Sequence, residues 1–519
     1  MKNDVCLLVA PFFVPSYIPL AIPTLLASLK NSGIKATSLD LNIEFWNKYV
    51  VKEDKIKGIN LLKEYLSKIL LYKKRLKEIS NDSYIFHLKK LIIKNDFKNV
   101  KELADFVVDD TYLSNLIYPF LYSQKLDCDI IGISVSYEDQ FVISLIIAKI
   151  LKSKGKKIIF GGSYISAIES NVLKDILDAI PVCDCFIKYP GDYTLPVICK
   201  KYLNDDYSLE CVPNIIWKSK KHSIINQEDH KQYNLVNIIP DYSKINLDSY
   251  LSPFPFCSVL LTQGCYYRKC TFCTNYMSYG NCYNEKCVDT LAKELEIISN
   301  MGIKYIYFVD DAIKPALLFE LLSILERYNF KWILETRLDK IFYSDEFCRK
   351  LYSSGCRLLS FGIETNSKTT LKKINKGIDN SLLPAISKIL NNNKIMVSST
   401  FIVNFPWENE QDVKETLDYI CVQKNLNFFG LSNFALLRDS IIYNEIIKEN
   451  KYHIKKKNVI SNIYRIEGFR ENTASLKEFE NINYVSTHKK ISSLIIHRMH
   501  FIMIEDIGIL NMQNMKKEV

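Results

Sequence analysis

Short apolar runs alternate with amphipathic helical patterns along the first part of the chain. The runs predict parallel strands, and helical periodicity between them predicts helices on both faces of one sheet. The predicted strands are residues 5–9, 35–41, 130–135, 157–160 and 183–187, and the clearest helices are 19–32, 140–154 and 192–202. Residues 1–205 are therefore expected to form an α/β domain with a doubly wound parallel sheet.

Two segments depart from this alternation of strands and helices. Between residues 48 and 122 the chain turns Lys/Leu-rich, with Leu62, Leu66 and Ile69 at helical spacing, which predicts a helical insertion. Residues 214–217 and 223–226 flank a Lys-rich turn and predict a hairpin. We assign residues 206–256 to this hairpin and a linker.

Six further strand–helix units follow. Their predicted strands are residues 258–262, 305–309, 332–335, 358–363, 397–403 and 428–431. Six such units predict a partial (β/α)6 barrel over residues 257–433, with ligands at the carboxyl ends of its strands. From residue 434 to 519 the pattern is irregular but helical, and predicts a helical carboxyl-terminal region.

Composition narrows the class of protein. The 519 residues suit two to four domains, and 58 acidic residues are interleaved with 68 basic ones. No basic run alternates with aromatics, so a nucleic-acid partner is disfavoured despite the net charge of +10. Residues 5–29 are uncharged and long enough to span a bilayer, but Pro11, Pro15, Pro19 and Pro23 interrupt any helix there. Without a secretory signal pattern, we expect a cytoplasmic protein that has no membrane partner.

The densest chemistry lies in one short segment. Cys265, Cys270 and Cys273 fall within nine residues, directly after an apolar strand. Thiolates are the ligands of iron–sulfur clusters, and three of them leave one iron of a cubane open. A zinc site is the alternative, with a fourth ligand from Cys257, Cys282 or Cys287, but zinc ribbons usually show two close cysteine pairs.

The cysteine segment resembles that of the radical S-adenosylmethionine (SAM) superfamily, in which an aromatic residue, here Phe272, precedes the last cysteine. Four residues separate the first two cysteines, where three are usual. The resemblance implies a [4Fe-4S] cluster on Cys265, Cys270 and Cys273 with SAM bound beside it.

Further motifs resemble the family in order and position. They lie at the ends of the second to fifth barrel strands, and the segment 401–408 resembles the turn that contacts adenine, which is usually richer in glycine than here. The residues that the resemblance assigns to SAM are Phe272, Asp310, Asp311, Glu335, Arg337, Glu364 and Asn404.

The first domain resembles the Rossmann-like cobalamin-binding domain that precedes the barrel in one large subgroup of this superfamily. The residues implied to contact cobalamin follow three strands: Ser134, Ser136, Gly161, Gly162, Ser163, Tyr189, Pro190 and Gly191. Loops at the carboxyl ends of such strands bind ligands, and glycines allow close approach. Because no Asp-x-His-x-x-Gly motif is present, cobalamin is expected to bind without a histidine on cobalt.

The resemblance thus implies a cobalamin-dependent methyltransferase that acts through a 5'-deoxyadenosyl radical. A small-molecule or peptide substrate and a reductant such as flavodoxin or ferredoxin are the expected partners. Cyclisation or another rearrangement is compatible with the same residues. A non-catalytic cobalamin or iron–sulfur sensor is a further alternative, against which the retained acids Asp310, Glu335 and Glu364 argue.

Overall fold

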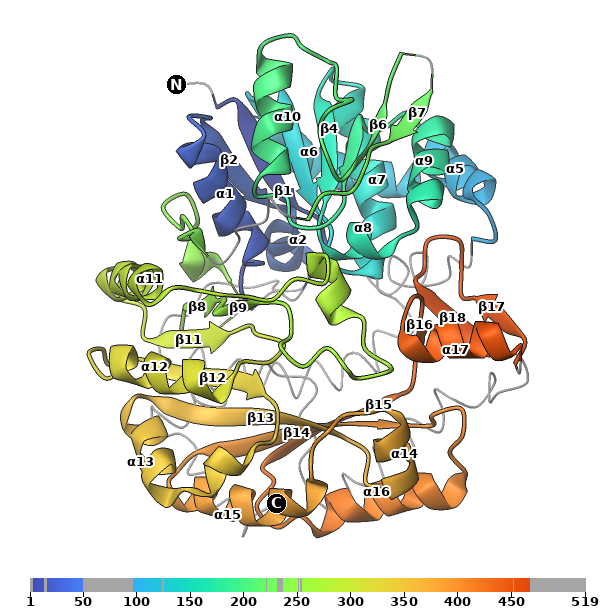
Figure 1. Ribbon diagram of the computed structural model, residues 1–519. Coiled ribbons are helices and arrows are strands. Elements are labelled where there is room, and N and C mark those ends of the chain that lie inside the picture. Colours follow the sequence, from blue (N-terminus) through green and yellow to red (C-terminus); the bar gives the residue numbers. More distant parts are fainter. Residues whose placement is uncertain are drawn as a thin grey trace. The chain divides into compact units, whose positions relative to one another are not determined.

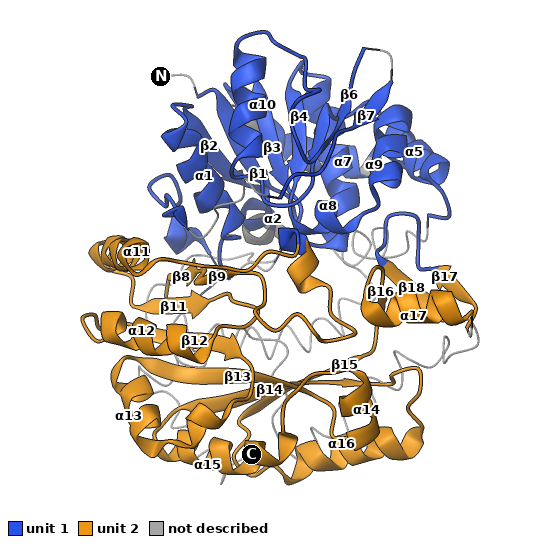
Figure 2. Cartoon of the chain, in the orientation of Figure 1, with its two compact units in different colours: residues 1–253, 278–280, 456–462 blue, residues 254–277, 281–455, 463–519 orange. Residues whose placement is uncertain are grey.

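A computed structural model describes residues 3–13, 16–49, 97–123, 126–220, 222–230, 237–250, 252, 254–450 and 452–466. The chain divides into two compact units (Figure 2). Unit 1 comprises residues 1–253, 278–280 and 456–462, and unit 2 comprises 254–277, 281–455 and 463–519. Most of the helical insertion predicted for residues 48–122 lies outside the described residues. Within the described ranges, no helix combines the length and hydropathy needed to cross a membrane.

Unit 1 is built on a seven-stranded sheet with the order β2-β1-β3-β4-β5-β6-β7 (Figure 1). Its strands are β1 (Val5–Val9), β2 (Ala36–Asp40), β3 (Ile130–Ser134), β4 (Lys157–Gly161), β5 (Cys185–Ile187), β6 (Ile215–Lys218) and β7 (Ser223–Ile225). The first five strands pair in parallel, which confirms the doubly wound sheet. The hairpin β6–β7 pairs antiparallel with β5 and so extends this sheet.

Helices cover the sheet of unit 1. They are α1 (Ala21–Asn31), α2 (Leu41–Tyr49), α5 (Val100–Asp109), α6 (Tyr112–Ser123), α7 (Glu138–Lys152), α8 (Ser163–Ala167), α9 (Ser170–Ala179) and α10 (Thr194–Leu203). α7 is buried over most of its length because α5 and α6 pack on it. α1 packs with α10. β1 and β3 are almost continuously apolar because both faces of their sheet are covered.

Unit 2 contains the six predicted parallel strands, in the order β15-β14-β13-β12-β11-β8. They are β8 (Phe256–Val259), β11 (Tyr305–Phe308), β12 (Lys331–Thr336), β13 (Cys356–Glu364), β14 (Met396–Val403) and β15 (Phe428–Asn433). The helices between them are α11 (Val288–Asn300), α12 (Pro315–Leu325), α13 (Asp345–Ser353), α14 (Lys368–Lys373), α15 (Leu383–Asn392) and α16 (Glu410–Val422). This sequential order confirms the partial barrel topology.

The two faces of this sheet differ in chemistry. Strand register places Phe308, Leu334 and Leu359 on one face, and helices α13, α15 and α16 pack against β13 and β14. The register places Glu335, Ser360 and Ser398 together on the opposite face. Glu335 remains partly exposed there. The polar face is therefore the one that can meet a ligand.

Residues 434–466 contain more than the predicted helix. α17 (Ile441–Glu449) is accompanied by a three-stranded sheet of β16 (Leu436–Leu437), β17 (Ile454–Lys456) and β18 (Ile463–Ile466). Leu436 and Tyr464 pair across this sheet, although they are far apart in the sequence. Such short strands depend on non-local pairing, which helical periodicity does not reveal. The rest of the region lies outside the described residues.

Candidate functional site

The three cysteines lie on one loop, residues 264–273, which we call the cysteine loop. It follows the short strand β9 (Thr262–Gln263), which pairs with β10 (Asn284–Glu285). Gly264 begins the loop with φ +82°, and a Cβ there would lie 2.3 Å from the carbonyl oxygen of Cys282. All three thiols are partly buried, and burial raises the pKa of Cys270 and brings that of Cys273 to about 12. Metal binding would release these protons.

The donor set is three cysteines on one loop. Among the described residues, no three His, Cys, Asp or Glu side chains are grouped closely enough to hold one metal ion. The zinc site, with Cys257, Cys282 or Cys287 as fourth ligand, stays an alternative from the sequence. In an iron–sulfur cubane each cysteine binds a different iron, so three separate thiols on one loop fit it.

The unusual cysteine spacing is accommodated by specific contacts. Arg268 has φ +49°, in the left-handed region, and its Nη1 donates to the carbonyl oxygen of Asn281. The Tyr267 hydroxyl donates to the carbonyl oxygen of Asn375 at 2.8 Å. Gly377 leaves room for that side chain, because a Cβ there would lie 2.2 Å from the Tyr267 oxygen. The longer loop is thus held by the segment after α14.

The end of the cysteine loop is braced from both sides. The Thr271 N–H donates to the carbonyl oxygen of Ile374 at 2.9 Å, and the Ile442 N–H donates to that of Thr271 at 3.0 Å. Phe272 meets Phe405 edge to face, with centroids 6.2 Å apart. The predicted aromatic neighbour of Cys273 is therefore fixed within a cluster of rings.

Two acids stand at the ends of adjacent barrel strands. Asp311 follows β11 and accepts a hydrogen bond from Asn275 Nδ2 at 3.3 Å. Partial removal from water and the negative charge of Glu335, on β12, raise the pKa of Asp311. The structure thus brings Asp311 and Glu335 together. Two neighbouring carboxylates favour a positively charged group between them.

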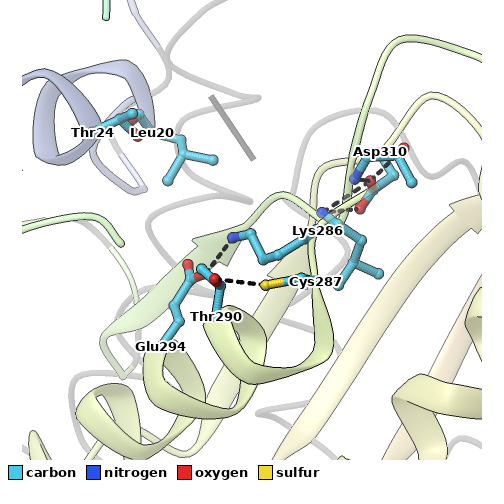
Figure 3. A network of polar contacts seen from close by, with 9 residues as sticks. Leu20, Thr24, Lys286, Cys287, Thr290, Glu294 and Asp310 are labelled. Atoms are coloured by element: carbon cyan, nitrogen blue, oxygen red, sulfur yellow. Dashed lines mark hydrogen bonds and ion pairs between the residues drawn. The ribbon is translucent and has the colours of Figure 1, made fainter. Parts of the chain in front are cut away.

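Asp310, which we predicted to contact SAM, is hydrogen-bonded to the segment before the cysteine loop. Its side chain accepts hydrogen bonds from the N–H groups of Leu261 and Thr262 and, at 2.9 Å, from the Thr262 hydroxyl (Figure 3). Asp310 as a whole residue is 4% exposed, and burial raises the pKa of its carboxyl group to about 7. Asp310 therefore anchors the segment that leads into the cysteine loop. The same bonds explain why β8 ends at Val259 and not at the predicted residue 262.

Glu364 and Arg337 are both engaged with protein groups. Glu364, with φ +68°, forms an ion pair of 2.7 Å with Lys376, which sequence reasoning missed. The Arg337 guanidinium stacks 3.7 Å above the Tyr267 ring, and its Nη1 lies 3.9 Å from Cys270 Sγ. Arg337 thus faces the cysteine loop, and its predicted contact with SAM stays a prediction.

The segment 401–408 shows how other residues replace the expected glycines. Asn404 adopts φ +65°, which asparagine tolerates better than most residues, and its Nδ2 donates to Asn433 Oδ1 at 2.5 Å. Trp407 stacks on Phe405 with centroids 5.5 Å apart and donates to Thr370 Oγ1 at 3.1 Å. The turn is therefore formed without glycine.

In unit 1, the predicted cobalamin residues gather at the carboxyl ends of the strands. The Val135 N–H donates to the carbonyl oxygen of Gly161 at 2.8 Å, and Ser163 Oγ donates to that of Ser136 at 3.2 Å. These bonds join the loops that carry Ser134 and Ser136 to the loop 161–163. The Tyr189 N–H donates to Ser166 Oγ at 2.7 Å, which ties the loop of Tyr189, Pro190 and Gly191 to α8.

Two buried amide side chains, missed in the sequence, hold this edge. Gln140 donates to the carbonyl oxygen of Ala10 and accepts from the N–H groups of Ser136 and Tyr137. Asn42 Oδ1 accepts from the N–H groups of Phe12 and Phe13, each at 3.0 Å. The strand order reverses between β1 and β3, where sheets of this type bind ligands, and both amides shape the loops there.

Comparison with known proteins agrees with this architecture. Residues 259–420 match the family model of the Radical SAM superfamily. An uncharacterized methyltransferase of Pyrococcus horikoshii is 23% identical over 332 residues, which span 62% of this chain and 70% of that protein. The ribosomal protein uS12 methylthiotransferase RimO of Hydrogenobaculum sp. is 28% identical over 209 residues, 37% of this chain and 51% of that protein.

Two solved structures are similar over nearly the whole chain. One is the radical SAM methyltransferase TsrM from Kitasatospora setae, with cobalamin and a [4Fe-4S] cluster bound: its TM-score is 0.63 at 12% identity, over 94% of this chain and 89% of that one. The other is the cobalamin-dependent SAM radical enzyme OxsB with aqua-cobalamin, with a TM-score of 0.62 at 14% identity, over 99% and 76%. At these identities the likeness shows the fold. The chain therefore contains a radical SAM domain over residues 259–420, and we describe it as a radical SAM enzyme.

Proposed function

We propose that this protein is a cobalamin-dependent radical SAM methyltransferase with a [4Fe-4S] cluster on Cys265, Cys270 and Cys273. The observation that carries the proposal is the cysteine loop itself, which follows the first strand of a six-stranded parallel sheet. The acids Asp311 and Glu335 stand at the ends of neighbouring strands. Barrels of this type bind their ligands at that edge.

The residues around the loop suit SAM. The paired carboxylates of Asp311 and Glu335 would hold its positively charged amino group. Glu364 would meet the ribose hydroxyls, and Phe272 and Asn404 would flank the adenine. When bound, the cluster and SAM supply a 5'-deoxyadenosyl radical, while the protein orients the substrate and excludes water.

The carboxyl edge of unit 1 suits cobalamin. Ser134, Ser136 and Ser163 offer hydroxyls, and apart from its chain neighbours the nearest described residue to a Cβ on Gly161 would be Ile187, at 3.9 Å. TsrM and OxsB were both solved with cobalamin, which supports the same ligand here. Binding without a histidine on cobalt remains our prediction.

The partners follow from this chemistry. We propose a small-molecule or peptide substrate and a flavodoxin or ferredoxin as electron donor. The cluster needs reduced thiols, which the cytoplasm maintains, so we assign the enzyme to that compartment.

The test is anaerobic reconstitution with iron and sulfide, followed by reduction with SAM and chromatography for 5'-deoxyadenosine and S-adenosylhomocysteine. Wild type is compared with Cys270→Ala and, as a control, with Cys287→Ala, whose exposed thiol lies outside the cysteine loop. We expect full iron and SAM cleavage in wild type and control, and loss of both in Cys270→Ala. A protein that assembles no cluster would contradict the proposal. A loaded cluster that never cleaves SAM favours the sensor, and cleavage without S-adenosylhomocysteine favours rearrangement chemistry.

A second variant tests the acids. Glu335→Gln removes one of the two carboxylates while keeping its shape. Because hydrogen bonds to charged groups contribute about 1.5–3 kcal/mol, SAM affinity should fall by about 10- to 100-fold. The dissociation constant for SAM is measured on cluster-loaded protein by equilibrium dialysis. Unchanged affinity at full iron content would remove Glu335 from the SAM site.

A further inference from the structure

We propose that Arg337, clamped on Tyr267, is a positioning residue for Cys270 that raises the reduction potential of the cluster. This inference rests on the proposed function, because it requires the cluster on the cysteine loop. It assigns Arg337 to the cluster ligand and not to the carboxylate of SAM.

The guanidinium of Arg337 is held on several sides. It stacks 3.7 Å from the centroid of the Tyr267 ring, and its Nη1 lies 3.9 Å from Cys270 Sγ. Its Nη2 donates to the carbonyl oxygens of Lys376 and, at 3.3 Å, of Gly377. Arg337 is 8% exposed, so its guanidinium group contacts mainly the cysteine loop and the segment beside it.

Tyr267, in the longer stretch between the first two cysteines, holds the Arg337 guanidinium. Tyr267 belongs to the four residues between Cys265 and Cys270, and its hydroxyl donates to the carbonyl oxygen of Asn375. Gly377, at φ +64°, leaves the space that the Tyr267 side chain fills. The segment 375–377 therefore accepts hydrogen bonds from both the Tyr267 hydroxyl and the Arg337 guanidinium. These bonds fix the ring and the cation next to each other.

Two cations act on Cys270. The charge of Lys376 has the larger effect, but its ammonium group is paired with Glu364 at 2.7 Å, whereas Nη1 of Arg337 lies 3.9 Å from Cys270 Sγ. In the part of the chain that the structure describes, Arg337 contacts backbone carbonyl oxygens, the Tyr267 ring, the Tyr266 side chain and the Cys270 thiol, and none of these partners is a carboxylate. A cation beside a cluster thiolate stabilises the reduced, more negative cluster, and so raises its potential.

The experiment compares Arg337→Gln and Arg337→Lys with wild type and with Arg357→Gln. Arg357 is a matched control, since it stacks 4.1 Å from the ring of Tyr352 and donates to backbone carbonyl oxygens, on β13. Iron content, the midpoint potential by redox titration monitored by electron paramagnetic resonance without SAM, and the dissociation constant for SAM are measured on reconstituted protein.

We expect Arg337→Gln to load as much iron as wild type and to have a more negative potential, with Arg337→Lys between them and Arg357→Gln at the wild-type value. SAM affinity should stay within about threefold. Equal potentials in fully loaded proteins, or a loss of SAM affinity of about tenfold at unchanged potential, would overturn the inference.

If Arg337→Gln fails to load iron, Tyr267→Leu replaces it, because this variant keeps the charge and removes the clamp. A more negative potential in Tyr267→Leu supports the inference, and an unchanged one overturns it. A wild-type protein without any cluster would overturn the proposed function and this inference with it, whereas equal potentials overturn this inference alone.

Discussion

Two adjacent glycines at the end of β4 meet different constraints. A Cβ on Gly162, at φ +109°, would lie 2.2 Å from the carbonyl oxygen of Val135, so packing alone requires glycine there. A Cβ on Gly161 would lie 3.9 Å from its nearest neighbour, Ile187, which is ordinary contact. The folded protein thus has room for a side chain at Gly161, where we propose that cobalamin approaches.

The pair of variants Gly161→Ala and Gly162→Ala separates fold from ligand. We expect Gly161→Ala to keep the wild-type melting temperature and to weaken cobalamin binding, because a methyl group would project toward the ligand. Gly162→Ala should lower the free energy of unfolding by about 1–3 kcal/mol through backbone strain and overlap. Thermal unfolding measures the stability of each variant. Titration with hydroxocobalamin, followed by absorbance, measures its affinity for cobalamin. Wild-type cobalamin affinity in Gly161→Ala would contradict the proposed position.

Helix α11 is tied to the start of the cysteine loop by a buried ion pair. Lys286 and Glu294 contact each other with 2% of each side chain exposed (Figure 3). The Lys286 N–H donates to the carbonyl oxygen of Leu261 at 2.8 Å, beside the bonds made by Asp310. Burial raises the pKa of Glu294, although the charge of Lys286 opposes that shift. Replacing Lys286 should therefore destabilise the packing of helix α11.

Lys286→Met should lower the free energy of unfolding by about 3–5 kcal/mol, because it leaves a buried carboxylate without its cation. The pKa of Glu294 is raised in the folded state, so its contribution to stability is lost as pH rises through that pKa. The penalty should accordingly be larger at pH 8 than at pH 5. Denaturant unfolding at both pH values measures it, and the double variant Lys286→Met/Glu294→Leu is the control that should recover most of the loss. An equal penalty at the two pH values would contradict this account.

Unit 1 contains a segment from late in the sequence. The chain leaves this unit near residue 253, and residues 456–462 pack within the same compact unit. Asn458 Nδ2 donates to Glu138 Oε1 at 2.7 Å, and the Tyr164 hydroxyl donates to the carbonyl oxygen of Ile460 at 3.1 Å. Ile460 itself is 2% exposed and belongs to the core of unit 1. The stability of unit 1 thus depends on residues that lie between two segments of unit 2 in the sequence.

Ile460→Ala should lower the free energy of unfolding of unit 1 by about 2–5 kcal/mol, as expected for truncating a buried isoleucine. Hydrogen exchange measured by mass spectrometry should show faster exchange in α7 and α8, while β13 and β14 of unit 2 keep their protection. Val459→Ala, at a partly buried position, is the control with a smaller effect. Uniform loss of protection in both units would contradict the assignment of this segment to unit 1.

Local pattern alone determined most of the strands and the ligand chemistry. The strands of both parallel sheets are apolar runs with helices between them, and such periodicity is written in consecutive residues. Cys265, Cys270 and Cys273 are close in sequence, so one loop must carry them. Asp311 and Glu335 were implied by the resemblance to the radical SAM family, and they lie near each other because parallel strands bring their carboxyl ends to one edge.

Tertiary contacts show interactions that the sequence did not reveal. The carboxylate of Asp310 accepts hydrogen bonds from the N–H groups of Leu261 and Thr262, and Arg337 contacts Tyr267 and Cys270. Neither Gln140 nor Lys376 belongs to a recognisable motif. Gln140 nevertheless holds a loop that is distant in sequence, and Lys376 pairs with Glu364 near the cysteines. Motifs name residue types, whereas the direction of a side chain depends on burial and on which distant groups need a hydrogen-bond partner, and only the packed fold settles both.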